Sequence, residues 1–140
     1  MGSEMCIRDR YMFGDGVAKD ERLGFVYSER AARQGLGWAQ HNTGVDYREG
    51  RGCDQSYERA AEWFEKAARK GDAGAMNDLG LLYETGQGVP QSYERAAELY
   101  KQGAARGNAV SQRDQATFHQ KIFKQASLVF THNPPLHINN

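Results

Sequence analysis

The sequence predicts an all-α fold, a right-handed α-solenoid of helix-turn-helix repeats with a period of 36 residues. Three series of residues recur at this interval without insertion or deletion. They are the glycine pairs Gly14 and Gly16, Gly50 and Gly52, Gly86 and Gly88; the tyrosines Tyr11, Tyr47 and Tyr83; and the single glycines Gly35, Gly71 and Gly107. The stretch from Gln55 to Glu62 also returns unchanged as Gln91 to Glu98. An identity of this length, in phase with the other series, indicates an internal repeat.

The first helix of each repeat is clearest in the last complete copy. Ala75, Leu79 and Tyr83 are spaced four residues apart and therefore share one face of a helix. Gly80, like Gly44 one repeat earlier, lies beside that face, where the missing Cβ lets a neighbouring helix approach closely. The glycine pair that follows suits the left-handed backbone that ends a helix and starts a tight loop.

The second helix begins after this loop and carries an N-cap signal. Ser92 is a favoured N-cap residue, as are its counterparts Ser56 and Asp20. Small residues then alternate with one large residue, a pattern that interlocks the helices of neighbouring repeats. Trp63 holds the large position, so we expect it in the core and expect its replacement by alanine to cost about 3–5 kcal/mol. The helix ends at the single glycine of each repeat.

The register divides the chain into a short leader, a repeat array and a terminal segment. These are residues 1–10, residues 11–119 with complete copies at 37–71 and 73–107, and residues 120–140. The leader is expected to be non-native or disordered, because Arg8 stands where both complete copies have glycine. The first copy is therefore partial, which suggests that the natural chain extends upstream. The fourth copy is degenerate and is expected to lead into a capping helix and a disordered tail, since Asn133 precedes two prolines.

Composition gives no reason to expect nucleic acid or a membrane as partner. The chain has 18 basic and 18 acidic residues, so its charges balance. No apolar run approaches the ~18 residues that span a bilayer, and no secretory signal opens the sequence as given. Two cysteines without motif spacing favour a reduced, cytoplasmic setting.

The sequence predicts no catalytic, cofactor or metal site. The glycine pairs lack both the preceding strand and the further motif residues that a phosphate-binding loop requires. Cys53 replaces the valine of other repeats, and we expect it to be a buried, inert thiol. The four histidines, His41, His119, His132 and His137, show no metal-ligand spacing.

These residues resemble the Sel-one-like repeat, a relative of the tetratricopeptide repeat. The matching pattern is Ala75, Leu79, Gly80, Tyr83, Gly86, Gly88, Val89, Ala96, Ala104 and Gly107. The resemblance implies a binding scaffold, since members act as adaptors in complex assembly, membrane-protein quality control and bacterial signalling or virulence. A few secreted, cysteine-rich relatives have been associated with β-lactam binding. The resemblance thus implies a fold and a class of work but no active site.

If the first helices line the concave surface, the residues opposite their core face form a stripe that binds a partner. The stripe comprises Trp38, His41, Asn42, Val45, Asp46, Asn77, Asp78 and Leu81. Amides and acids around an exposed aliphatic residue suit a peptide held by backbone hydrogen bonds and side-chain packing. The alternative is that Val45 and Leu81 pack against the adjacent repeat and the other positions are ordinary surface.

The function predicted from these observations is a non-catalytic scaffold or adaptor that binds a partner protein or peptide. The alternative is a fragment of an enzyme, or an accessory to one, of the hydrolase or cell-wall and β-lactam-binding type. A concave pocket with a nucleophile beside a base would favour this alternative, and the sequence shows no such pair.

Overall fold

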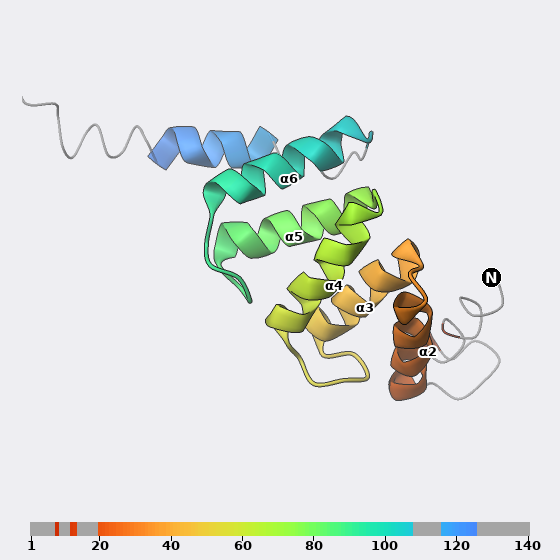
Figure 1. Cartoon of the computed structure of the whole chain (residues 1–140). Coiled ribbons are helices and arrows are strands. Elements are labelled where there is room, and N and C mark those ends of the chain that lie inside the picture. The colour runs from red at the N-terminus through yellow and green to blue at the C-terminus, as the bar shows by residue number, and fades with distance from the viewer. Residues whose placement is uncertain (1–7, 9–11, 14–19, 108–115, 126–140) are drawn as a thin grey trace, which may run out of the picture.

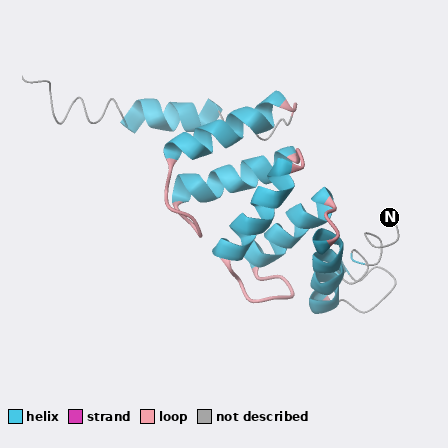
Figure 2. Cartoon of the chain, viewed as in Figure 1, coloured by secondary structure: helices cyan, strands magenta, loops and turns pink. Residues whose placement is uncertain are grey.

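The computed structural model describes residue 8 and residues 12–13, 20–107 and 116–125, and every structural statement below concerns these residues. Five helices have described bounds: α2 (Glu21–Arg33), α3 (Gly37–Glu49), α4 (Tyr57–Arg69), α5 (Ala73–Thr85) and α6 (Tyr93–Ala105). Residues 116–125 are also helical. Figure 2 shows helices and loops but no strand in the described part of the chain.

The helices form a stack in which each packs against the next in the chain (Figure 1). The starts of α2, α4 and α6 lie 36 residues apart, as do the starts of α3 and α5. The predicted all-α repeat solenoid and its period are therefore confirmed. None of the helices in the described ranges is long and apolar enough to cross a membrane.

The predicted helix signals act as expected. Ser56 and Ser92 accept hydrogen bonds from the backbone N–H groups of Arg59 and Arg95, each at 3.2 Å, and so cap α4 and α6. Asp20 caps α2 in the same way at 3.1 Å. The glycines at the repeat turns have left-handed backbones: Gly35, Gly50, Gly52, Gly71, Gly86, Gly88 and Gly107. The positions Tyr11, Gly14 and Gly16 lie outside the described residues.

Within each repeat, an aromatic ring of the second helix lies on a glycine of the first. A Cβ atom on Gly44 would lie 2.6 Å from the ring of Phe64, and one on Gly80 would lie 2.7 Å from the ring of Tyr100. Both rings are fully buried. The predicted close approach at Gly44 and Gly80 therefore exists, and these two rings make it.

Trp63 differs from the prediction that it belongs to the core. It is only partly buried, and the Lys66 ammonium lies 4.4 Å from its ring centroid. Its neighbour Phe64 is fully buried instead. The helix is rotated so that Phe64 faces its own first helix, which leaves Trp63 at the edge between two apolar clusters.

A few described residues lie near the two ends of the predicted repeat array, but they do not test its predicted limits. Arg8 is helical and buried, and its guanidinium lies 3.5 Å from the Asp46 carboxylate. Phe118, in the helical segment 116–125, is buried against Tyr100 at a centroid distance of 5.5 Å. Most of the leader and all of 126–140 lie outside the described residues, so these limits remain predictions.

Candidate protein-interaction surface

The predicted binding stripe lies on α3 and α5, the first helices of the two complete repeats. Six of its eight members have at least partly accessible side chains: Trp38, His41, Asn42, Val45, Asp78 and Leu81. Leu81 is the most open of the stripe's apolar residues, with 38% of its surface exposed. Val45 instead packs against the main apolar cluster, as the alternative interpretation of the stripe expected.

Asp46 and Asn77 do not belong to an exposed surface. Asp46 is fully buried beneath Arg8, and burial raises its pKa from 3.8 to about 6 despite that positive neighbour. Asn77 is 5% exposed. Their placement in the stripe is corrected by the structure, because the helix faces that carry them are covered by adjacent parts of the stack.

His41 is partly buried and joins two consecutive repeats. Its Nε2 atom lies 2.7 Å from Asp78 Oδ2 in α5, and its Nδ1 atom lies 3.3 Å from Oδ1 of Asp72, the N-cap residue of α5. Arg48 reaches the second oxygen of Asp78 at 3.1 Å. The imidazole also meets the ring of Phe64 edge-on at 5.7 Å. We name His41, Arg48, Asp72 and Asp78 the repeat clasp.

The electrostatics of the repeat clasp favour a charged imidazole. Burial lowers the pKa of His41, but the hydrogen bonds and negative charges of Asp72 and Asp78 outweigh it and raise the pKa from 6.5 to about 9. The pKa of Asp72 is lowered: burial raises it, and the opposing interactions with His41 and nearby backbone N–H groups prevail. His41 and Asp78 therefore hold the repeats together in this structure.

Sequence reasoning did not identify the repeat clasp. The signal that could have indicated it is Gly74, where a Cβ atom would lie 2.7 Å from His41 Cε1. A glycine one turn before Asp78 leaves room for an imidazole that arrives from the preceding repeat. Spacing within a single helix does not reveal this contact, because its partners are more than 30 residues apart in the chain.

The accessible residues on these helices can contact a partner by packing and amide hydrogen bonds. Trp38, Asn42 and Val45 are spaced to share one face of α3, and Leu81 occupies the α5 position that corresponds to Val45. We name Trp38, Asn42 and Leu81 the first-helix surface. The partly exposed edge of Trp38, which packs on the cluster of Ala31, Ala32 and Ala39, together with an amide and an exposed leucine, is suited to holding a peptide.

Cys53 is only partly buried, rather than buried as the sequence predicted, and it packs against the main apolar cluster. Burial, together with the nearby carboxylates, raises its pKa from 9.0 to about 11. Its Sγ atom donates to the Asp46 backbone carbonyl at 3.5 Å. Among the described residues, no group of three or more His, Cys, Asp or Glu side chains could hold a metal ion.

Comparisons with known proteins agree with the repeat architecture. The family model of the Sel1 repeat matches residues 3–36, 39–72 and 73–108. The structure of a protective antigen of uropathogenic Escherichia coli with an SLR fold aligns with a TM-score of 0.76 and 35% identity, over 79% of this chain and 24% of that one. A Sel1 repeat protein from Oxalobacter formigenes aligns with a TM-score of 0.78 and 32% identity, over 84% and 48%.

A curated relative matches over a shorter region. The chitin synthase regulator SKT5 of Saccharomyces cerevisiae is 46% identical over 56 residues, which is 39% of this chain and 8% of the yeast protein. The chain thus spans less than half the length of each of these three proteins.

Proposed function

The chain belongs to the Sel1 repeat family, and from this premise we propose that it is a non-catalytic scaffold that binds a partner protein or peptide. Repeats of this family commonly mediate protein interactions. A stacked array suits this work because each repeat adds surface while its neighbours supply the core.

The observation that carries the proposal is that α3 and α5 bury one face in the stack and leave residues of another face accessible. Their inner faces bury Ala39, Thr43, Ala75 and Leu79 in the stack. The repeat clasp links the two helices through the ion pairs of His41 and Arg48 with Asp78, which helps to hold the first-helix surface in place. A surface that is ordered before binding loses less conformational entropy when a partner docks.

A specific observation favours one class of partner. The relative that matches at 46% identity carries the name of a chitin synthase regulator. By analogy, the partner of this scaffold is an enzyme whose activity it regulates. This candidate corresponds to the accessory role that the sequence left open as its alternative.

Affinity capture from a lysate of the source cells tests the proposal. The wild-type chain is compared with Asn42→Ala/Leu81→Ala, and Lys101→Ala on the exposed side of α6 is the control. We expect a partner that the wild type and the control retain and that the double variant loses by about tenfold in affinity when rebound in purified form. Circular dichroism checks that all three chains are equally helical.

Two outcomes would contradict the proposal at different levels. Capture of the same partner by the wild type and the double variant would move the interface away from the first-helix surface. Absence of any retained protein would argue against a scaffold role for the chain itself.

A further inference from the structure

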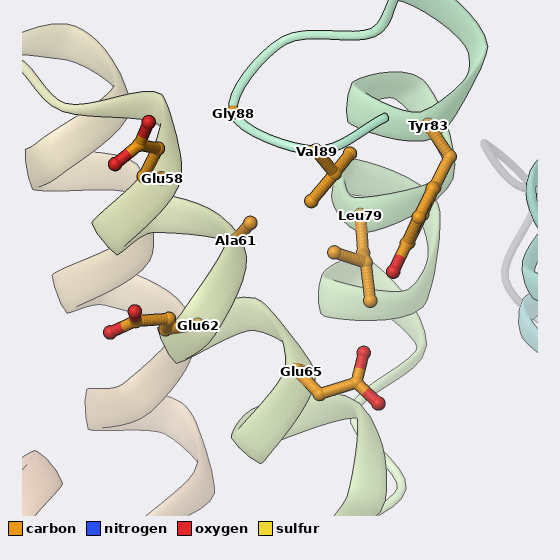
Figure 3. Close-up of a pocket in the computed structure, with 8 residues that line it drawn as sticks. All are labelled: Glu58, Ala61, Glu62, Glu65, Leu79, Tyr83, Gly88 and Val89. Carbon is orange, nitrogen blue, oxygen red and sulfur yellow. The ribbon is translucent and has the colours of Figure 1, made fainter. Parts of the chain in front are cut away.

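A groove lies between α4 of one repeat and α5 of the next, and its volume is about 390 Å³ (Figure 3). Its apolar walls are Ala61 of α4, Leu79 and Tyr83 of α5, and Val89 in the loop that follows. Figure 3 shows the Ala61 methyl group directed toward Val89 and Leu79. We name this space between the two helices the α4–α5 groove.

The preceding repeat junction shows what fills the equivalent space. One period earlier, Ala61 corresponds to Phe25 and Tyr83 corresponds to Tyr47. Phe25 is 8% exposed, and its ring meets that of Tyr47 edge-on with centroids 5.1 Å apart. In the α4–α5 groove, Ala61 replaces this phenylalanine, so no ring of α4 lies beside Tyr83. We call the space that the Phe25 ring fills at the earlier junction, and its equivalent beside Tyr83, the seat.

The hollow that remains at the earlier junction has a different lining. Beside Phe25 and Tyr47 it is bordered by Cys53, Asp54, Ser56 and Arg59. A second hollow at this junction is lined by Arg22, the counterpart of Glu58, together with Gly52, Cys53 and Asp54, so a positive charge stands there in place of a negative one. The two junctions therefore have equivalent helices and loops. They differ in the side chain beside the tyrosine, Phe25 at one and Ala61 at the other, and in the charges nearby.

The α4 side of the groove is acidic. Glu58, Glu62 and Glu65 line it, whereas the corresponding residues of the earlier repeat are Arg22, Val26 and Glu29. Figure 3 shows Glu65 directed toward α5, whereas the Glu58 and Glu62 side chains extend from the side of α4 opposite Val89 and Leu79.

Two of these acids are available to a cationic partner. Glu65 already lies 3.5 Å from Arg95 and 3.6 Å from Arg69. Glu58 and Glu62 are exposed, and neither has an ion-pair partner within the described residues. The nearby Arg59 donates a hydrogen bond to the Tyr47 hydroxyl at 3.4 Å and also attracts the Glu62 carboxylate, without a close ion pair between the two.

We propose that the α4–α5 groove binds a short basic segment of a partner protein. One aromatic side chain of that segment takes the seat between Ala61 and Tyr83, as Phe25 does beside Tyr47. Lysine or arginine residues that flank it pair with Glu58 and Glu62 at the rim. The inference rests on the proposed scaffold function and specifies the chemistry of the partner.

The first test fills the seat. Fluorescence anisotropy follows binding of a labelled peptide, GKRFKRG, to the wild-type chain and to Ala61→Phe, which restores the ring of the earlier junction. We expect Ala61→Phe, or replacement of the peptide phenylalanine by alanine, to weaken binding by about tenfold or more. The matched control is Ala97→Phe, the same repeat position in α6 and not part of the groove.

The second test removes charge and does not depend on how well a new ring packs. Glu58→Gln/Glu62→Gln is compared with Glu94→Gln/Glu98→Gln, the same positions in the identical segment of the next repeat. We expect the first pair to lower peptide affinity by about tenfold at low salt and to reduce its salt dependence. The second pair is expected to bind as the wild type does.

The outcomes separate this inference from the proposed function. Failure of the wild type to bind GKRFKRG, or equal binding by the wild type, Ala61→Phe and the Glu58/Glu62 pair, would overturn the groove proposal. A partner captured through the first-helix surface would leave the scaffold function standing in that case. Peptide binding that Ala61→Phe abolishes supports the groove even when the first-helix surface captures nothing.

Discussion

At the scale of single residues, His41 shows how one side chain joins two repeats. Burial alone would lower its pKa, and the carboxylates of Asp72 and Asp78 reverse that effect and raise it to about 9. The imidazole is therefore protonated across the neutral range in the folded chain. In the unfolded chain its pKa is close to the ordinary value of 6.5.

This difference predicts a pH-dependent stability. Because the folded-state pKa is the higher one, the contribution of His41 is fully present below pH 6.5 and is lost as the pH rises through about 9. We expect the free energy of unfolding, measured by urea denaturation, to fall by about 2 kcal/mol between about pH 6 and about pH 8.5. His41→Asn introduces the residue that stands at the equivalent position of the next repeat, Asn77. It should remove this decrease in the free energy of unfolding with pH.

The choice of pH range isolates His41 from the other shifted groups. The raised pKa of Asp46 lowers stability only as the pH rises from 3.8 through about 6. The raised pKa of Cys53 lowers it only from about 9 upward. If the free energy of unfolding changed equally with pH in the wild type and in His41→Asn between these limits, titration of the repeat clasp would not be the cause.

At the scale of elements, the loop between α5 and α6 docks one repeat on the preceding one. Gly88 has φ +73°, and a Cβ atom on it would lie 2.3 Å from the Tyr57 carbonyl carbon at the start of α4. Gly52 makes the same approach to Glu21, with a corresponding distance of 2.1 Å to its carbonyl oxygen. The second glycine of each pair thus serves both the turn and the contact between repeats.

Gly107 has the same left-handed backbone, but among the described residues no atom lies within 4 Å of the position that its Cβ atom would take. Gly107→Ala should therefore cost only the backbone strain, about 1 kcal/mol. Gly88→Ala should cost about 3 kcal/mol or more, since the clash is with backbone that must shift. Urea denaturation followed by circular dichroism compares the two, and similar losses would refute a docking role for the loop.

At the scale of the whole molecule, the fold is a one-dimensional stack. The extensive helix contacts run from α2 to α3, α3 to α4, α4 to α5 and α5 to α6. In such an array, stability is close to a sum of repeat and nearest-neighbour contributions, so a local defect has a local effect.

Phe118 tests this locality near the C-terminal end of the described array. It is 3% exposed and packs against Tyr100 and Tyr93. We expect Phe118→Ala to cost about 3 kcal/mol and to increase amide hydrogen exchange in α6, with α3 unchanged. Phe123→Ala, in the same helical segment but 74% exposed, is the control and should change neither. Exchange that rises equally in α3 and α6 would argue for a single cooperative unit.

Much of the fold could be predicted from the sequence because it depends on local interactions. The period set where each helix begins, since a serine cap or a left-handed glycine acts within a few residues of its own position. The small residues at Gly44 and Gly80 indicated close helix approach for the same reason.

The candidate surface could be predicted only in part. Periodicity shows which residues share a helix face, but it does not show how far each helix turns about its axis or which part of the next repeat covers that face. This is why Asp46 and Asn77 are buried, and why Phe64 rather than Trp63 fills the core.

The sequence by itself therefore determined the repeat, its helices and their turns. Only the tertiary structure decided that His41 is held by the following repeat, and that the seat filled by Phe25 at one junction is left open beside Ala61 at the next. The physical reason is that exposure and charge pairing depend on side chains tens of residues away, brought together by the angle between successive helices.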